Sequence, residues 1–179
     1  MEFRLPQPFI KATTSPMTMG HLMDRKNHER DRNYFPSNDP TEWLLGYRMP
    51  PFQRQAVWTK PQKIRFIESA WLGFHLGTYV VNRLDIWVNN HPHPFDLWLI
   101  DGQQRLRALK SYLENEIKVF DFWWSDLNVV EQRVFDSVMF AQSIVVETDE
   151  EKLRVMYDRL NFGGTPHKKS QRATTGALK

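Results

Sequence analysis

The chain has 179 residues, 41% of them hydrophobic and 13% aromatic, and a formal net charge of +3. This length suits one sizeable core rather than two independent domains, and the mild positive charge allows nucleic-acid binding without requiring it. The absence of cysteine excludes disulfides, thiolate nucleophiles and cysteine-based zinc sites, and no stretch has the apolar length of a signal peptide or membrane span, so we expect a cytoplasmic protein with no membrane partner.

The first part of the chain predicts an irregular arm followed by the start of a domain. Residues 1–40 contain five prolines and a charged run without sustained periodicity, which indicates an irregular N-terminal arm with room for one short helix. Residues 41–45 favour a helical turn, and residues 47–51 a short extended segment. Pro61 followed by apolar residues at spacings of three and four predicts an amphipathic helix over residues 61–74.

The rest of the chain alternates strand and helix patterns. Two adjacent strands are predicted at 78–88 and 95–100, with a turn between them, and a third at 143–147. Helices are predicted at 106–116, 125–139 and 153–160. We therefore expect one α+β (mixed α/β) domain over residues 41–166, with a small mixed sheet flanked by helices, and a basic tail over residues 167–179.

The strongest local signal is the run Asp101-Gly102-Gln103-Gln104-Arg105, where a buried strand turns through glycine into a helix. Such a junction presents backbone N–H groups and the positive end of the helix dipole at one point, which favours an anion such as phosphate. Glycine lets a ligand approach the main chain, the glutamines offer amide groups, and Arg105 can hold phosphate oxygens in a bidentate fork.

A structural interpretation of the same run is also open. Asp101 and Gln104 are spaced as a capping pair, which by itself stabilises a helix start by about 1 kcal/mol. From the residues alone the two interpretations are evenly matched. Capping gives no role to Gln103 or Arg105, and this excess of polar groups favours a functional site.

Two further clusters are candidates for the walls of a site. Gln53 and Arg54 lie between aromatic residues, of which we expect Phe52, Trp58 and the neighbouring Val57 to be core. The run Asn161-Phe162-Gly163-Gly164 before Thr165-Pro166 is typical of a glycine C-cap that ends a helix, and can also form a backbone wall of a pocket.

These motifs together resemble the DGQQR family, formerly domain of unknown function 262. Pro51-Phe52-Gln53-Arg54, Asp101-Gly102-Gln103-Gln104-Arg105-Leu106 and Leu160-Asn161-Phe162-Gly163-Gly164-Thr165-Pro166 occur in the family's order over about residues 47–166. The family is found at the N-terminus of GmrSD-type modification-dependent restriction enzymes and of sensors of phosphorothioated DNA. The resemblance implies a ParB/sulfiredoxin-like single domain that binds, and often hydrolyses, a nucleotide to gate action on modified or foreign DNA.

The resemblance also implies a set of site residues and cofactors. Asp101, Gln104 and Arg105 would be catalytic, with Asp101 contacting metal or the attacking water. Gln53, Arg54, Gly102 and Gln103 would line the nucleotide pocket, with Asn161, Gly163 and Gly164 at its edge. The expected cofactors are a nucleoside triphosphate (ATP or GTP) and Mg²⁺.

The chain departs from the family at its C-terminal end. Residues 167–171 are basic where the family continues with a leucine, serine and acidic pattern, and the nuclease domain usually fused downstream is not in this sequence. We therefore expect no DNA cleavage by that route, and a separate nuclease or effector protein is a possible partner.

Two other function classes stay open. One is a nonenzymatic DNA-binding or decoy module, in which Lys168, Lys169, Arg172 and the basic residues of 25–32 contact phosphates. The other is a ParB-like DNA nickase. No P-loop, dinucleotide fingerprint or histidine pair at metal-ligand spacing supports a different catalytic class.

Overall fold

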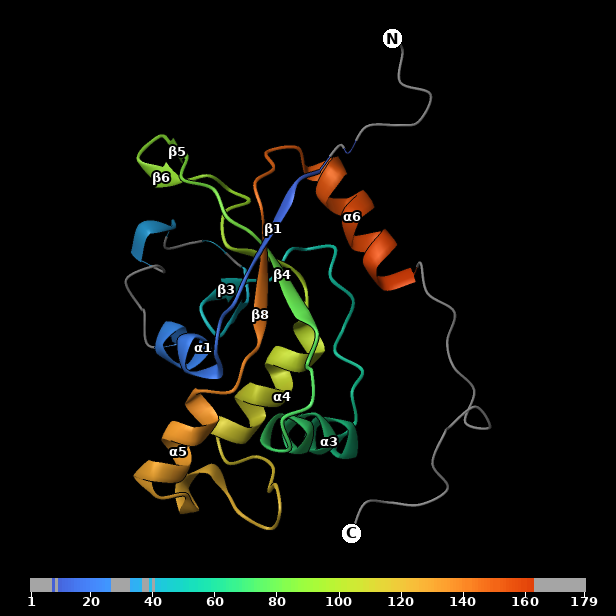
Figure 1. The fold of residues 1–179 in the computed structure, drawn as a ribbon. Helices are drawn as coiled ribbons and strands as arrows, with labels where there is room; N and C mark the ends of the chain where they lie inside the picture. Colours follow the sequence, from blue (N-terminus) through green and yellow to red (C-terminus); the bar gives the residue numbers. More distant parts are fainter. Residues whose placement is uncertain (1–7, 9, 27–32, 37–38, 40, 163–179) are drawn as a thin grey trace.

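The structure, a computed structural model, describes residues 8, 10–26, 33–36, 39 and 41–162 (Figure 1). Its helices are α1 (Met19–Lys26), α3 (Lys60–Trp71), α4 (Gln103–Leu113), α5 (Val129–Asp136) and α6 (Glu150–Phe162), with a 3-10 turn, η1 (Trp124–Asp126). Its strands are β1 (Ala12–Ser15), β2 (Trp43–Leu44), β3 (Tyr47–Arg48), β4 (Thr78–Asn82), β5 (Trp87–Val88), β6 (His91–Pro92), β7 (Trp98–Asp101) and β8 (Ala141–Val145). None of the helices in this part of the chain combines the length and the apolar character needed to cross a membrane.

The described strands form one six-stranded mixed sheet in the order β1-β8-β4-β7-β3-β2, and β5 and β6 form a separate hairpin. The pairs β4/β8 and β3/β7 are parallel, and β1/β8, β4/β7 and β2/β3 are antiparallel. In Figure 1, α3, α4 and α5 gather at one end of the sheet and the β5–β6 hairpin lies at the other. The expected α+β class with a mixed sheet is confirmed.

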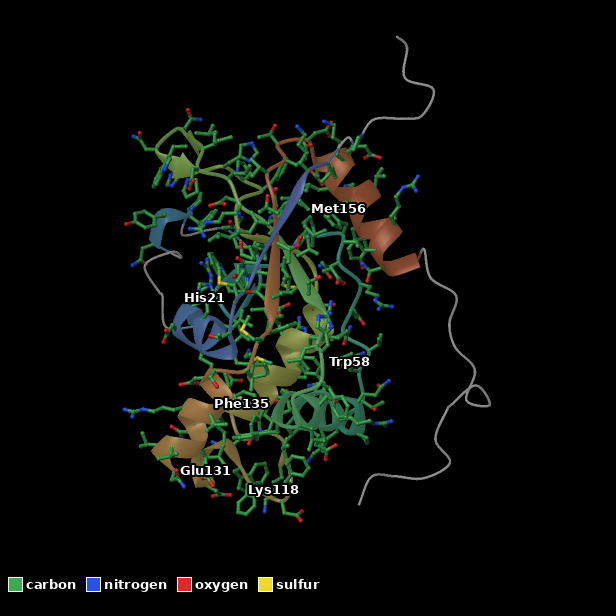
Figure 2. The ribbon with its side chains drawn as sticks, viewed as in Figure 1. His21, Trp58, Lys118, Glu131, Phe135 and Met156 are labelled. Carbon is green, nitrogen blue, oxygen red and sulfur yellow. The ribbon has the colours of Figure 1, made fainter. Side chains whose placement is uncertain are left out.

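Alternation along the central strands divides the core between the two faces of the sheet. Tyr79, Val81 and Leu99 join the large core formed with α1, α3, α4 and α5. Val80, Trp98 and Ile100 join a smaller core closed by α6. Successive residues of a strand point to opposite faces of the sheet, so the short apolar strands β4 and β7 contribute buried side chains to the cores on both faces. Figure 2 labels a member of each side, Phe135 on α5 and Met156 on α6.

The predicted helices form, with boundaries set by their caps. The helix expected at 61–74 runs from Lys60 to Trp71, starting at a Thr59 capping box with Pro61 in its first turn. The helix expected at 125–139 is instead split into η1 and α5. The split arises because the Asn128 side chain accepts from the N–H groups of Val130 and Glu131 and so starts a new helix.

Two local predictions were wrong because of tight turns. Residues 41–45 form no helical turn: Leu45 and Gly46 have φ of 49° and 77°, and this two-residue turn joins β2 to β3. The strand expected at 78–88 ends at Asn82. The last part of the predicted range, residues 87–88, pairs instead with residues 91–92. Asn89 and Asn90, with φ values of 51° and 65°, form the tight turn of this second hairpin.

The segment 12–26, which we assigned to an irregular arm with room for one short helix, contains that helix, α1, and also a strand, β1. β1 extends the sheet by pairing with β8, and α1 buries Met19 and Leu22 completely in the large core. The strand was missed because Thr13 and Thr14 are exposed at a sheet edge, so the sequence lacks an apolar alternation. The expected tail over 167–179 lies outside the described residues.

Candidate functional site

The turn between β7 and α4 is built around Gly102. Its φ is 105°, and a Cβ there would lie 2.6 Å from the Cβ of Tyr79, so only glycine fits. The helical hydrogen bonds begin when the N–H of Leu106 donates to the Gly102 carbonyl at 2.9 Å. The N–H groups of residues 103–105 therefore lack acceptors within the helix. Together with the helix dipole they form a positive end that favours an anion.

Asp101 and Arg105 form an ion pair at this turn. Nη2 of Arg105 lies 2.6 Å from Oδ2 of Asp101, and Nη1 donates to the Leu76 carbonyl at 3.3 Å. Both side chains are partly accessible, at 21% for Arg105 and 27% for Asp101. The structural interpretation of Asp101 and Gln104 as a capping pair was wrong, because α4 starts at Gly102 without any side-chain cap.

Gln104 fixes the connection that leads into α3. Its Oε1 accepts from the backbone N–H groups of Val57 and Trp58 at 3.2 and 3.1 Å. Because both partners are donors, the oxygen of the amide must face them. The Nε2 donor is buried and has no acceptor among the described residues. Gln104 therefore holds the segment opposite the α4 turn in place.

Gln53 attaches the preceding part of that connection to the end of β7. Its Nε2 donates to the carbonyls of Leu99 and Ile100 at 2.6 and 3.2 Å. The backbone N–H of Arg54 donates to the Tyr157 hydroxyl at 3.1 Å. The Arg54 side chain is exposed, and no described residue pairs with its guanidinium. These bonds place an exposed cation beside the α4 turn.

A cavity of about 300 Å³ lies where these segments meet. It is lined by residues from the 53–58 connection, the β7–α4 turn and the end of α6, namely Gln53, Arg54, Trp58, Asp101, Gly102, Gln103, Gln104, Arg105 and Asn161. The structure thus brings together every candidate site residue that it describes. Gly163 and Gly164 lie outside the described residues. With two arginines and one carboxylate, this lining has an excess of positive charge.

Trp58 is the lining residue that sequence reasoning assigned elsewhere. We expected it in the core, and it does pack against the large core, with its ring 5.8 Å from that of Phe66 between centroids. It is only half-buried, however, and also lines the cavity. Figure 2 shows it on the connection before α3. The neighbouring Val57, also expected in the core, is 60% exposed. Residues 53–59 form neither helix nor strand, so no periodicity could indicate which side chain points inward.

The cavity suits Mg²⁺ only as part of a phosphate complex. Asp101 is the one carboxylate among the described lining residues, and no group of three acidic or histidine side chains gathers anywhere in the described ranges. Protein-bound Mg²⁺ commonly uses one or two carboxylates and takes its other ligands from water and substrate phosphates. Asp101 fits that role.

Comparison with protein families matches residues 36–171 to the model described as "GmrSD restriction endonuclease, N-terminal domain". The matched region covers most of the chain and contains every lining residue of the cavity. The chain belongs to this family.

Membership of the GmrSD N-terminal domain family indicates a role in restriction and phage defence. The match confirms the resemblance to the GmrSD-type family that was found in the sequence and that implied the set of site residues. β1 and α1 precede the matched region, so the edge strand of the sheet lies outside it. No curated protein and no solved structure matches the chain.

Proposed function

We propose that this GmrSD-type domain binds a nucleoside triphosphate with Mg²⁺ in the cavity at the β7–α4 turn, and that it hydrolyses the triphosphate or transfers its terminal phosphoryl group. The observation that carries the proposal is the convergence of Arg54, Arg105 and the first-turn N–H groups of α4 on one cavity. A polyanion is the ligand that such a group of donors and cations recognises.

The ion pair between Asp101 and Arg105 assigns a role to each residue. A phosphate near Gly102 competes with the Asp101 carboxylate for the Arg105 guanidinium, which stabilises the bound anion. Asp101 is then available to hold the metal or to orient an attacking water. Bound Mg²⁺ would neutralise charge on the phosphate oxygens.

The remaining residues position these groups. Gln53 and Gln104 use their amides on backbone atoms, which fixes the 53–58 connection across from α4. Arg54 reaches the cavity from that connection and supplies the second cation. We assign these glutamines a positioning role, and assign phosphate contact to Arg54, Arg105 and the backbone of residues 103–105.

Calorimetric titration with ATP and GTP in the presence of Mg²⁺ tests the proposal. We expect binding by the wild type and a loss of about tenfold or more in Arg105→Ala, since a charge-assisted hydrogen bond contributes about 1.5–3 kcal/mol. The control is Arg65→Ala, which removes an equal charge from an exposed position on α3 outside the cavity. Absence of binding by the folded wild type contradicts the proposal and favours the DNA-binding or decoy module.

A further inference from the structure

One face of α6 contacts both the cavity and the connection that carries Arg54. Residues three and four apart on a helix lie on the same face, as Arg154, Tyr157 and Asn161 do. The Arg154 guanidinium stacks over the Phe52 ring, with Cζ 4.7 Å from the centroid. Tyr157 accepts a hydrogen bond from the Arg54 N–H at 3.1 Å, and Asn161 lines the cavity. The connection therefore passes beside α6 and is attached to it (Figure 1).

The hydroxyl of Tyr157 is a fixed point. Tyr157 is 5% exposed and belongs to the small core with Ile100 and Leu153. Phe52 packs on its ring at 5.4 Å between centroids. Because protein interiors are close-packed, this ring cannot shift its hydroxyl without moving the side chains around it. The connection is thus attached to a rigid part of the molecule.

The backbone at Arg54 has few other attachments. The N–H groups of Gln55 and Ala56 find no acceptor among the described residues, and this stretch forms neither helix nor strand. Side chains hold the connection on either side: Gln53 bonds the end of β7, and Gln104 bonds the residues before α3. Without the tyrosine hydroxyl, the backbone of Arg54 would move between these two attachments. Holding its long side chain at a phosphate would then cost more conformational entropy.

We infer that Tyr157 is a positioning residue of the triphosphate site: its hydroxyl fixes the backbone of Arg54 and so brings the Arg54 guanidinium to the phosphates. This inference rests on the proposed function. Tyr157 is not among the described residues that line the cavity, so its hydroxyl acts on the ligand only through Arg54. The β7–α4 turn with Arg105 does not depend on it.

A double-mutant cycle tests this dependence. Tyr157→Phe removes the hydroxyl and keeps the ring, and Arg54→Ala removes the guanidinium and keeps the N–H that the hydroxyl accepts from. Tyr112→Phe is the matched control, because Tyr112 is 1% exposed in the large core and does not line the cavity. Calorimetry gives the Kd of each protein and of the double variant for Mg²⁺ with ATP or GTP, whichever the wild type binds more tightly. The titrations are made at low and at raised sodium chloride, on proteins shown to be folded by circular dichroism.

We expect Tyr157→Phe to weaken binding about three- to tenfold, as for the loss of one hydrogen bond between neutral groups, and Arg54→Ala to weaken it about tenfold or more. The double variant should bind as Arg54→Ala does, because the hydroxyl then has no cation to position. Tyr157→Phe should also lose part of the salt dependence of binding although it changes no charge, since a displaced guanidinium contributes less of the attraction that salt screens. Tyr112→Phe should match the wild type in both measurements.

Four results would overturn the inference and leave the proposed function standing. They are an unchanged Kd in Tyr157→Phe or in Arg54→Ala, losses that add in the double variant, the full wild-type salt dependence in Tyr157→Phe, and an equal loss of affinity in Tyr112→Phe. A folded wild type that binds neither ATP nor GTP overturns both the inference and the proposed function.

Discussion

Two glycines leave room for the guanidinium of Arg105. A Cβ on Gly77 would lie 2.7 Å from its Nη1, and a Cβ on Gly102 would lie 3.8 Å from its Nη2. Gly77 has a φ of 75°, in the left-handed region that disfavours other residues. Sequence reasoning did not select Gly77, because nothing in the sequence indicates that the turn before β4 contacts the start of α4.

Gly77→Ala should therefore affect the site as well as stability. We expect a loss of about 1–2 kcal/mol in the free energy of unfolding from the positive φ, and weaker nucleotide binding because the methyl group displaces Arg105. Gly73→Ala is the control: its φ is also 75°, but a Cβ there meets nothing within 4 Å. Urea unfolding and calorimetry measure the two effects. Equal nucleotide affinities in the two variants would contradict this role of Gly77.

A second prediction at this scale concerns Asp96, which is 9% exposed. Burial raises the pKa of its carboxyl above the usual value of 3.8, although N–H groups of Leu84 and Leu97 act in the opposite direction. A raised pKa means that the folded state binds the proton more tightly than the unfolded chain. The contribution of Asp96 to stability is therefore most favourable below pH 3.8 and declines as the pH rises through the folded-state pKa.

Asp96→Asn should remove this dependence while keeping an oxygen that accepts from the Leu84 N–H. We expect the stability of the variant relative to wild type to rise between pH 4 and pH 7, as measured by urea unfolding at a series of pH values. A difference that stays constant or falls over this range would show that the Asp96 pKa is not raised by burial.

At the scale of elements, the spacing of apolar residues predicted those helices and strands whose pattern is visible within a short stretch of sequence. The helices around Ile67, Leu109 and Leu153 and the buried strands β7 and β8 form close to their predicted ranges, and β4 forms over the first part of its predicted range. The failures lie where pairing partners are distant or polar. Thr14 of β1 pairs with Ser143, far along the chain, and a polar edge strand has no apolar pattern to reveal it.

α1 forms part of the core of the domain, although the apolar pattern of the sequence did not place it there. Leu22 is fully buried in the large core, so Leu22→Ala should cost about 2–5 kcal/mol in the free energy of unfolding. Leu160→Ala on α6 is the control, because this leucine is 48% exposed, and it should cost about 0.5 kcal/mol or less. A similar, small loss in both variants would mean that the N-terminal helix is not part of the core.

At the scale of the whole molecule, the candidate site depends on three segments far apart in the sequence. The β7–α4 turn provides Asp101 and Arg105, the 53–58 connection provides Arg54, and α6 provides Asn161. The motifs could be predicted from the sequence as separate clusters. The sequence could not predict that these motifs share one cavity or that Trp58 lines it. Both facts depend on how α6 and the 53–58 connection pack against the sheet.

Since the cavity exists only in the folded state, a ligand bound there should stabilise the whole domain. At a nucleotide concentration of about 100 Kd the gain is about 2.7 kcal/mol, which corresponds to a rise of about 5–10 °C in the thermal midpoint. We expect this rise with Mg²⁺ and nucleotide for the wild type, and about half of it or less for Arg105→Ala at the same concentration, because a tenfold weaker Kd leaves a gain of about 1.4 kcal/mol. Differential scanning calorimetry measures both. Equal rises in the two proteins would place the bound nucleotide elsewhere.

The most direct test of the central claim is to locate the bound nucleotide by NMR, following the backbone amide resonances of the isotope-labelled chain as GTP and Mg²⁺ are added. We predict that the largest shifts occur at Gln103, Gln104 and Arg105, with smaller ones at Arg54 and Trp58, and that Gly73 does not shift. Shifts confined to other parts of the chain, or no shifts at saturating nucleotide, would contradict the assignment of the β7–α4 turn as a triphosphate site.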